Sequence, residues 1–312
     1  MARFYILYSM RSRRIYYREP VFRPPSEAYS LLIQATEGCT FHCSFCISNI
    51  GKDFLIRSIE DIKKDIDIAK ELYGDQVEKI FLLDGNAFVM KPDMLITISN
   101  YAYEKFPRLQ RVGAYAHAKD ILRKSDEELS RIAAAGFKIV YLGIETGDDE
   151  LLHKIGKQTN ADELTEAAQK LHRANITLSG TIILGMAGNN PELSRKHAEA
   201  TARLINRMNP QVPKIWYISA LTLMTPPGTK IYEEIEKGQI KVQTSLEALQ
   251  ELKIIIENLS DDLKNLVWRS NHASNYLPLK GDLAQDKKKL LDTIQYGIDH
   301  PEVLRPEYFR GL

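Results

Sequence analysis

The alternation of strand-like and helix-like stretches constrains the fold of this chain most. Between residues 31 and 223, short runs rich in Val, Ile, Leu and Tyr alternate with longer stretches in which apolar residues recur at helical spacing. Strands separated by helices form parallel sheets with right-handed crossovers, so we expect an α/β protein with a partial (β/α)6 TIM-like barrel. The predicted strands are residues 31–36, 77–83, 111–115, 137–144, 176–184 and 214–223, and the predicted helices between them are residues 58–73, 93–106, 125–136, 161–174 and 191–208.

Both flanks of this region lack the alternation. Residues 1–30 form an Arg- and Tyr-rich N-terminal arm, with six arginines up to Pro25 against one acid, Glu19. Such an arm could bind RNA through phosphate contacts and stacking. The alternative, which its short length and its prolines favour, is an arm that packs its aromatic residues across the barrel and leaves its arginines in water. Residues 31–240 would then be the barrel, and residues 241–312 a C-terminal helical extension, with helices at 245–259 and 283–298, that closes the substrate side.

Overall charge and hydropathy give little information on the binding partners of this chain. The 312 residues contain 42 Lys and Arg against 41 Asp and Glu, so net charge does not indicate a nucleic-acid or membrane partner. No apolar run approaches the roughly 20 residues that span a bilayer, and the N-terminal residues lack the layout of a signal peptide. We therefore expect a cytoplasmic protein without a membrane span.

All three cysteines lie in one short stretch, Cys39-x3-Cys43-x2-Cys46. Three thiolates on an irregular loop can bind three irons of a cubane [4Fe-4S] cluster and leave the fourth iron open to a small molecule. Two alternatives are a zinc site completed by a distant histidine such as His117, and thiols that only pack. His42 is a poor fourth ligand, because it is adjacent to Cys43 and its side chain should point away.

This spacing, with Phe45 directly before the last cysteine, resembles the signature of the radical S-adenosylmethionine (radical SAM) enzymes. The resemblance implies that the open iron binds the amino and carboxylate groups of SAM, and that the reduced cluster cleaves SAM to methionine and a 5'-deoxyadenosyl radical. It also implies an electron donor such as ferredoxin or flavodoxin. Free thiols and an oxygen-sensitive cluster agree with a reducing cytoplasm.

Barrel enzymes place their chemistry at the carboxyl ends of the strands, and polar residues follow several predicted strands here. Asp84, Gly85 and Asn86 stand where the family has a Gly-Gly-Glu segment that holds the methionine amino group, and the departure leaves open whether Asp84 or Asn86 makes that contact. A plain strand-to-helix turn is the alternative for these three residues.

The segment from Gly143 to Lys157 resembles the subset of radical SAM proteins that contains the Elongator catalytic subunit, the methylthiotransferases and the coproporphyrinogen dehydrogenases. This resemblance implies that Glu145 binds the ribose hydroxyls of SAM, whereas the structural alternative is a helix-capping acid. By strand period Ser179 and Thr181 share a face and could reach the SAM carboxylate. The family resemblance places the turn at Gly185 against the adenine.

The predicted substrate contacts come from two regions. Tyr115 and Met224 could line the floor of the cavity, with core packing as the alternative. A polar stretch without periodicity, residues 269–276, offers donors and acceptors, and either contacts substrate or staples a loop; its predicted contacts are Arg269, Asn271, His272 and Asn275. The stretch from Arg269 to Lys280 also resembles unassigned radical SAM proteins of anaerobic microbes.

The three cysteines leave none for an auxiliary cluster, so sulfur insertion is not expected. The chain also has no counterpart of the RNA-binding barrel of the methylthiotransferases and no cobalamin domain ahead of the barrel, so cobalamin-dependent methyl transfer is not expected. The sequence predicts a radical SAM enzyme that abstracts hydrogen from a small organic substrate. The alternatives are an RNA-modifying radical SAM enzyme and a non-catalytic iron-sulfur sensor or scaffold.

Overall fold

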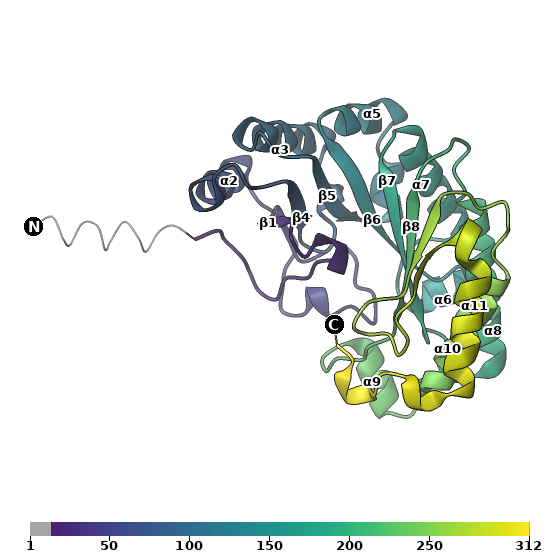
Figure 1. The fold of residues 1–312 in the computed structure, drawn as a ribbon. Helices are drawn as coiled ribbons and strands as arrows, with labels where there is room; N and C mark the ends of the chain where they lie inside the picture. Colours follow the sequence, from purple (N-terminus) through teal and green to yellow (C-terminus); the bar gives the residue numbers. More distant parts are fainter. Residues whose placement is uncertain (1–13, 312) are drawn as a thin grey trace, which may run out of the picture.

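The computed structural model describes residues 14–311, which form a curved eight-stranded sheet with helices along its outer side (Figure 1). The strand order is β1-β4-β5-β6-β7-β8-β9-β10, and all neighbouring strands are parallel except the antiparallel pair β9 and β10. The strands are β1 (Leu31–Gln34), β4 (Lys79–Leu83), β5 (Arg111–Ala116), β6 (Phe137–Glu145), β7 (Thr177–Leu184), β8 (Trp216–Thr222), β9 (Leu266–Arg269) and β10 (Lys280–Asp282). The short strands β2 (Thr36–Glu37) and β3 (Leu55–Ile56) form a separate antiparallel pair.

The predicted barrel strands are confirmed as β1 and β4 to β8, and the predicted helices as α2, α3, α5, α7, α8, α10 and α11. Their ends follow local signals: Ser58 caps α2, and Ser125 with Glu128 forms the predicted capping box of α5. Three helices of five to seven residues were not predicted, because such lengths show no clear periodicity. The helices are α2 (Ile59–Tyr73), α3 (Pro92–Lys105), α4 (Ala118–Leu122), α5 (Asp126–Ala134), α6 (Asp149–Lys154), α7 (Ala161–Arg173), α8 (Pro191–Arg207), α9 (Lys230–Glu236), α10 (Ser245–Glu257) and α11 (Leu283–Asp299).

The region after residue 240 contains the two predicted helices and, in addition, two strands that were not predicted. After α10, β9 adds a further parallel strand beside β8, and β10 returns antiparallel to β9. A strand of four residues is too short for its alternation to be recognised, and its place depends on pairing with β8. The polar stretch that follows Arg269 therefore begins at the carboxyl end of a strand, at the same edge of the sheet as the other strand-end loops.

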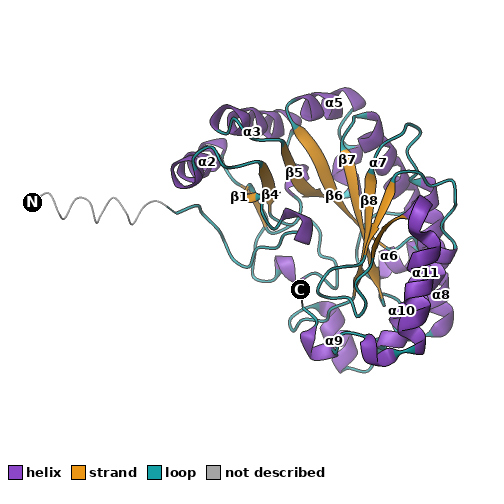
Figure 2. Cartoon of the chain, viewed as in Figure 1, coloured by secondary structure: helices purple, strands orange, loops and turns teal. Residues whose placement is uncertain are grey.

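The core lies between the sheet and the helices that cover its outer face (Figure 2). Its largest fully buried side chains include Trp216 and Trp268 on the neighbouring strands β8 and β9. Among the described residues, no helix has both the length and the apolar composition needed to cross a membrane.

The described part of the arm, residues 14–30, packs on the protein. The Tyr17 hydroxyl donates to the carbonyl of Leu32 at 2.7 Å, and the Arg18 guanidinium lies 3.0 Å from the Glu37 carboxylate. Tyr17 thus packs on the barrel, as the second interpretation of the arm expects. Arg18 differs from that interpretation, because it forms an ion pair instead of remaining in water. Of the other five arm arginines, Arg14 and Arg23 are exposed, as that interpretation expects, and Arg3, Arg11 and Arg13 lie outside the described residues.

A buried carboxylate anchors the end of the arm. Glu27 accepts a hydrogen bond from the Tyr141 hydroxyl on β6, and its Oε1 lies 2.8 Å from Nη1 of Arg111 on β5. This contact holds the preceding residues of the arm over the carboxyl end of the sheet.

Replacing Glu27 with alanine is expected to lower the free energy of unfolding by about 2–4 kcal/mol, because it leaves the Arg111 charge without its partner. Chemical denaturation measures the change. Glu236, which is exposed and on α9, provides a matched control, since Glu236→Ala should stay within about 0.5 kcal/mol of wild type. Equal stability of the Glu27→Ala and Glu236→Ala proteins would show that the arm is not anchored through Glu27.

Candidate active site

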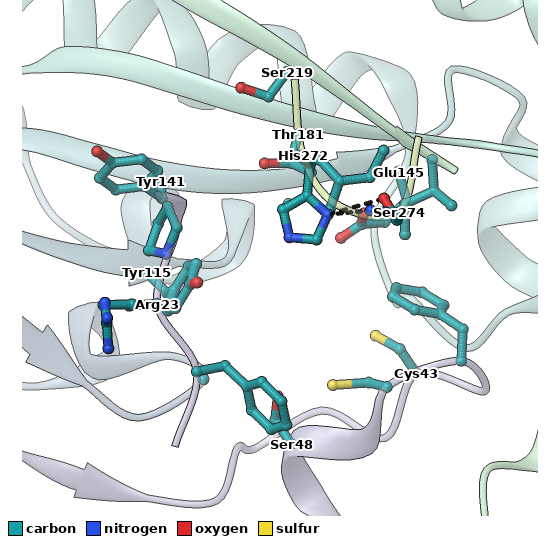
Figure 3. A pocket seen from close by; sticks show the side chains of 18 of the residues that line it. Arg23, Cys43, Ser48, Tyr115, Tyr141, Glu145, Thr181, Ser219, His272 and Ser274 are labelled. Atoms are coloured by element: carbon teal, nitrogen blue, oxygen red, sulfur yellow. Dashed lines mark hydrogen bonds between the residues drawn. The ribbon is translucent and has the colours of Figure 1, made fainter. Parts of the chain in front are cut away.

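A cavity of about 560 Å³ lies at the carboxyl ends of the strands (Figure 3). Its walls come from the arm, the cysteine loop, the ends of β4 to β9, and the loop between β9 and β10. The predicted site residues that line it are Cys39, Cys43, Phe45, Cys46, Asp84, Gly85, Asn86, Tyr115, Glu145, Thr181, Met224, Arg269, Asn271 and His272.

The three cysteines are free, partly exposed thiols on one wall of this cavity. Their loop is held by backbone hydrogen bonds from Ser44 N to the carbonyl of Ile155 and from Ile231 N to the carbonyl of Ser44. Burial raises the pKa of Cys43 to about 11 and also raises that of Cys39.

The arrangement of the thiols fits a cluster. Within residues 14–311 there is no group of three or more His, Cys, Asp or Glu side chains that could hold a single metal ion. A zinc ion would require sulfur ligands about 2.3 Å from one centre, whereas each ligand of a cubane cluster binds a different iron. Three free thiols that line one cavity match the number and type of protein ligands that a [4Fe-4S] cluster with one open iron takes.

His117, the zinc ligand of the alternative interpretation, has both ring nitrogens engaged. Nδ1 accepts a hydrogen bond from Lys119 N at 3.2 Å, and Nε2 lies 2.7 Å from the carbonyl of Lys157, to which it donates. Burial, followed by the charge of Lys157, lowers the pKa of His117 to about 3. The ring also stacks on Phe41, so His117 has a structural role in this wall.

The loop after β4 is organised by charge. The Asp84 carboxylate accepts from Lys52 Nζ at 2.7 Å and from the backbone N–H of Gly38 at 3.2 Å. Burial raises the pKa of Asp84, and Lys52 opposes that effect. Asn86 donates to Asp120 at 2.6 Å and accepts from His117 N at 3.2 Å, so its side chain joins neighbouring loops. Of the two candidates for the methionine amino group, Asp84 therefore offers the negative charge.

Glu145 ends β6 and forms a buried ion pair with Lys157, with 2.7 Å between Nζ and Oε1. Burial alone would lower the pKa of Lys157, but the Glu145 carboxylate and then the Cys43 sulfur raise it above its ordinary value. Lys157 is therefore a permanent cation beside the cysteine loop. Gly143 lies under this pair, because a Cβ there would sit 2.2 Å from Glu145 Oε1 and 2.6 Å from Lys157 Nζ.

Two predicted SAM contacts lie away from the cavity surface. Ser179 is buried and Gly185 begins the turn after β7, and neither is among the residues that line the cavity, whereas Thr181 is. The N–H of Gly185 donates to the buried Glu251 carboxylate at 2.7 Å, which holds that turn against α10.

The residues of the polar stretch 269–276 have two different roles, since some line the cavity and one holds the loop to β8. Arg269, Asn271 and His272 line the cavity. Asn275 does not line it, since its side chain accepts from the Thr222 hydroxyl at 2.9 Å and donates to the carbonyl of Ala220 at 2.8 Å. Asn275 thus staples the loop to β8.

Arginines near the carboxyl end also hold this loop. Arg305 donates to the carbonyl of Ala273 at 2.6 Å and to that of Asn275 at 2.9 Å, and Arg310 donates to the carbonyl of Ser274 at 2.7 Å. These bonds fix the backbone next to His272.

Sequence reasoning missed several residues in or directly behind the cavity wall. Lys52 neutralises Asp84, and Lys157 neutralises Glu145. The sequence shows only that each lysine lies near a predicted strand-end loop, which does not indicate its partner. Residues 22–26 of the arm, together with Ser219 and Lys280, also line the cavity. Their positions depend on strand pairing and arm packing, which the sequence pattern does not reveal.

Comparison with known proteins gives consistent results. The sequence model of the radical SAM superfamily matches residues 33–200. The bacteriochlorophyllide d C-12(1)-methyltransferase of Chlorobaculum tepidum is 26% identical over 223 residues, which cover 68% of this chain and 44% of that protein. An uncharacterized methyltransferase of Pyrococcus horikoshii is 24% identical over 208 residues, covering 65% of this chain and 41% of that protein. The chain therefore spans less than half the length of these two relatives.

A third relative and a solved structure extend the comparison. A probable threonylcarbamoyladenosine tRNA methylthiotransferase of Methanocaldococcus jannaschii is 27% identical over 176 residues, which cover 54% of this chain and 40% of that protein. The structure of the coproporphyrinogen III oxidase HemN from Escherichia coli matches with a TM-score of 0.51 and 13% identity, covering 80% of this chain and 54% of that chain. At this identity the structural likeness shows the fold, and it confirms the predicted barrel-like architecture.

Proposed function

The chain belongs to the radical SAM superfamily, and on that premise we propose that it abstracts a hydrogen atom from a small organic substrate. It is a radical SAM enzyme, whose cofactors are a [4Fe-4S] cluster and SAM. When bound and reduced, the cluster supplies the electron that cleaves SAM and yields the adenosyl radical. The observation that supports the proposal most is that the cysteines, Asp84, Glu145 and the loop after β9 all face one cavity.

Different residues of this chain would bind the cluster and the separate parts of SAM. The thiolates of Cys39, Cys43 and Cys46 would hold the cluster. The Asp84 carboxylate, oriented by Lys52, would accept from the methionine ammonium. Glu145 would accept from the ribose hydroxyls, and Lys157 beside it offers a cation to the methionine carboxylate.

The opposite part of the cavity is suited to a small substrate. Tyr115 and Tyr141 lie on the side of the cavity away from Cys43 in Figure 3, and residues 22–26 of the arm also line the cavity. The Nδ1 atom of His272 accepts from Ser274 N at 3.1 Å, so the neutral ring carries its proton on Nε2. In Figure 3 this ring lies in the middle of the view, between Tyr141 and Cys43. His272 and Asn271 would orient the substrate rather than bind SAM.

The test uses purified protein that has been reconstituted with iron and sulfide under anaerobic conditions and then reduced. Incubation with SAM is expected to yield 5'-deoxyadenosine and methionine. A fully loaded cluster that produces no 5'-deoxyadenosine would contradict the proposal, and if it also produces no S-adenosylhomocysteine the result would favour the sensor or scaffold.

Methyl transfer is the second candidate, because two of the matched relatives are named methyltransferases. The same incubation separates the two reactions: transfer of the methyl group releases S-adenosylhomocysteine, whereas hydrogen abstraction requires 5'-deoxyadenosine. S-adenosylhomocysteine as the sole product from SAM would favour methyl transfer.

A further inference from the structure

One continuous row of register-paired residues crosses five strands at the cavity. The strand registers pair Gly143 with Thr181, Thr181 with Ser219, Ser219 with Arg269, and Arg269 with Lys280. All five residues line the cavity. The row therefore runs from the glycine under the Glu145–Lys157 pair, past two hydroxyl groups, to a pair of cations at the other end.

The cations at the far end lack carboxylate partners. Both carboxylates that line the cavity, Asp84 and Glu145, are already paired with Lys52 and Lys157. Within the described part of the chain, Arg269 and Lys280 form no ion pair with any acid, and the same is true of Arg23 on the arm, which also lines the cavity. This end of the cavity therefore has excess positive charge.

The placement of Arg269 opposite Lys280 has an energetic cost. Directly opposed residues on antiparallel strands have Cβ atoms about 4.5–5.5 Å apart, and like charges at such positions are destabilising. The guanidinium of Arg269 is held in place by stacking on the Tyr217 ring, 4.1 Å from its centroid. Lys280 is exposed and has no such contact with a described residue, so its flexible side chain can reach an anion that binds beside the fixed guanidinium, and the anion stabilises both charges.

We propose that Arg269 and Lys280 bind an oxyanion of the substrate, a carboxylate or a phosphate ester, with Ser219 as a further hydrogen-bond donor. This inference rests on the proposed function and names its substrate class, a small organic acid or phosphorylated molecule. Arg269 lies three strands from Gly143, about 14 Å along the sheet at about 4.8 Å per strand. The anionic group is thus held away from the Glu145–Lys157 pair, and the part of the substrate that reacts lies between them, over Thr181 and Ser219.

Anion binding to the anaerobically reconstituted protein tests this inference without any measurement of SAM cleavage. The probes are sodium phosphate and sodium citrate, titrated by calorimetry at constant ionic strength with sodium chloride. At least one probe is expected to bind saturably, and Arg269→Gln and Lys280→Gln are each expected to weaken that binding about tenfold or more. The matched control is Arg195→Gln, which removes an exposed arginine on α8 and should bind like wild type. Saturable binding of phosphate alone indicates a phosphate ester, and binding of citrate alone indicates a carboxylate.

Melting temperatures provide a second measurement that does not depend on the probes. Lys280→Gln is expected to raise the melting temperature of the protein without anion, because it removes the repulsion with Arg269, even though it weakens anion binding. A lower melting temperature together with unchanged anion binding would mean that Lys280 is only structural, and would overturn the inference. Saturable binding of neither probe would also overturn it, as would tRNA retention that requires Arg269 while neither small anion binds. Because SAM cleavage is not measured, failure of this inference is distinguishable from failure of the proposed reaction.

Discussion

Replacing Cys43 with alanine is expected to abolish both assembly of the cluster and formation of 5'-deoxyadenosine. The chain has three cysteines, all of them on this cavity wall, so no other thiol can take the place of the lost ligand. Iron content, visible absorption of the reconstituted protein and product formation from SAM measure the effect. Product is expected to fall to the level of a sample without protein.

Ser44 gives a matched control within the same loop. Its backbone N–H and carbonyl make the hydrogen bonds that position the loop, to Ile155 and Ile231, and these bonds survive in Ser44→Ala. This variant should keep the iron content and activity of wild type. SAM cleavage by the Cys43→Ala protein at a rate near that of Ser44→Ala would show that the thiols do not hold the cluster.

Replacing Lys157 with methionine is expected to destabilise the protein by about 3–5 kcal/mol, because the Glu145 carboxylate then remains buried without its partner. For a chain of 312 residues the melting temperature should fall by about 5–8 °C. SAM binding should weaken as well, since the cation beside the cysteine loop is lost. Thermal unfolding and equilibrium dialysis with labelled SAM measure the two effects separately.

The double variant Glu145→Gln/Lys157→Met distinguishes stability from ligand binding. It removes both charges of the pair, so most of the lost stability should return, whereas SAM binding should stay weak because both charged groups are absent. Recovery of SAM affinity together with stability would mean that the pair is only structural and that neither residue contacts SAM.

Local patterns predicted most of the elements and the cysteine loop. Helices such as α7 and α8 have apolar residues at helical spacing and polar caps at Asn160 and Asn190, so their bounds depend on neighbouring residues. The cysteine spacing is equally local, which is why the cluster and the superfamily could be predicted from the sequence. The thiols, Asp84 and Glu145 were likewise expected at strand ends, because parallel strands bring their carboxyl ends to one edge.

Contacts between distant segments could not be predicted in this way. Lys52 and Asp84 are 32 residues apart in the sequence. Their pairing depends on the tertiary contact between the segment after the cysteine loop and the end of β4. For Asn275 the sequence left open whether it contacts substrate or staples the loop, and its hydrogen bonds to β8, which depend on the loop conformation, give it the stapling role. The arm was recognised by its composition, yet its position over the cavity depends on the buried contact between Glu27 and Tyr141.

The sequence by itself determined the order of the β/α units, the three thiols and the class of enzyme, because each of these is encoded by residues close together in the chain. Only the tertiary structure decided which charges in the cavity are neutralised and which are not. Lys157 pairs with Glu145, whereas Arg269 faces Lys280 across β9 and β10 and has no acid partner in the described residues. Charge pairing depends on distances of a few ångströms between side chains from separate strands and loops, and strand pairing sets those distances.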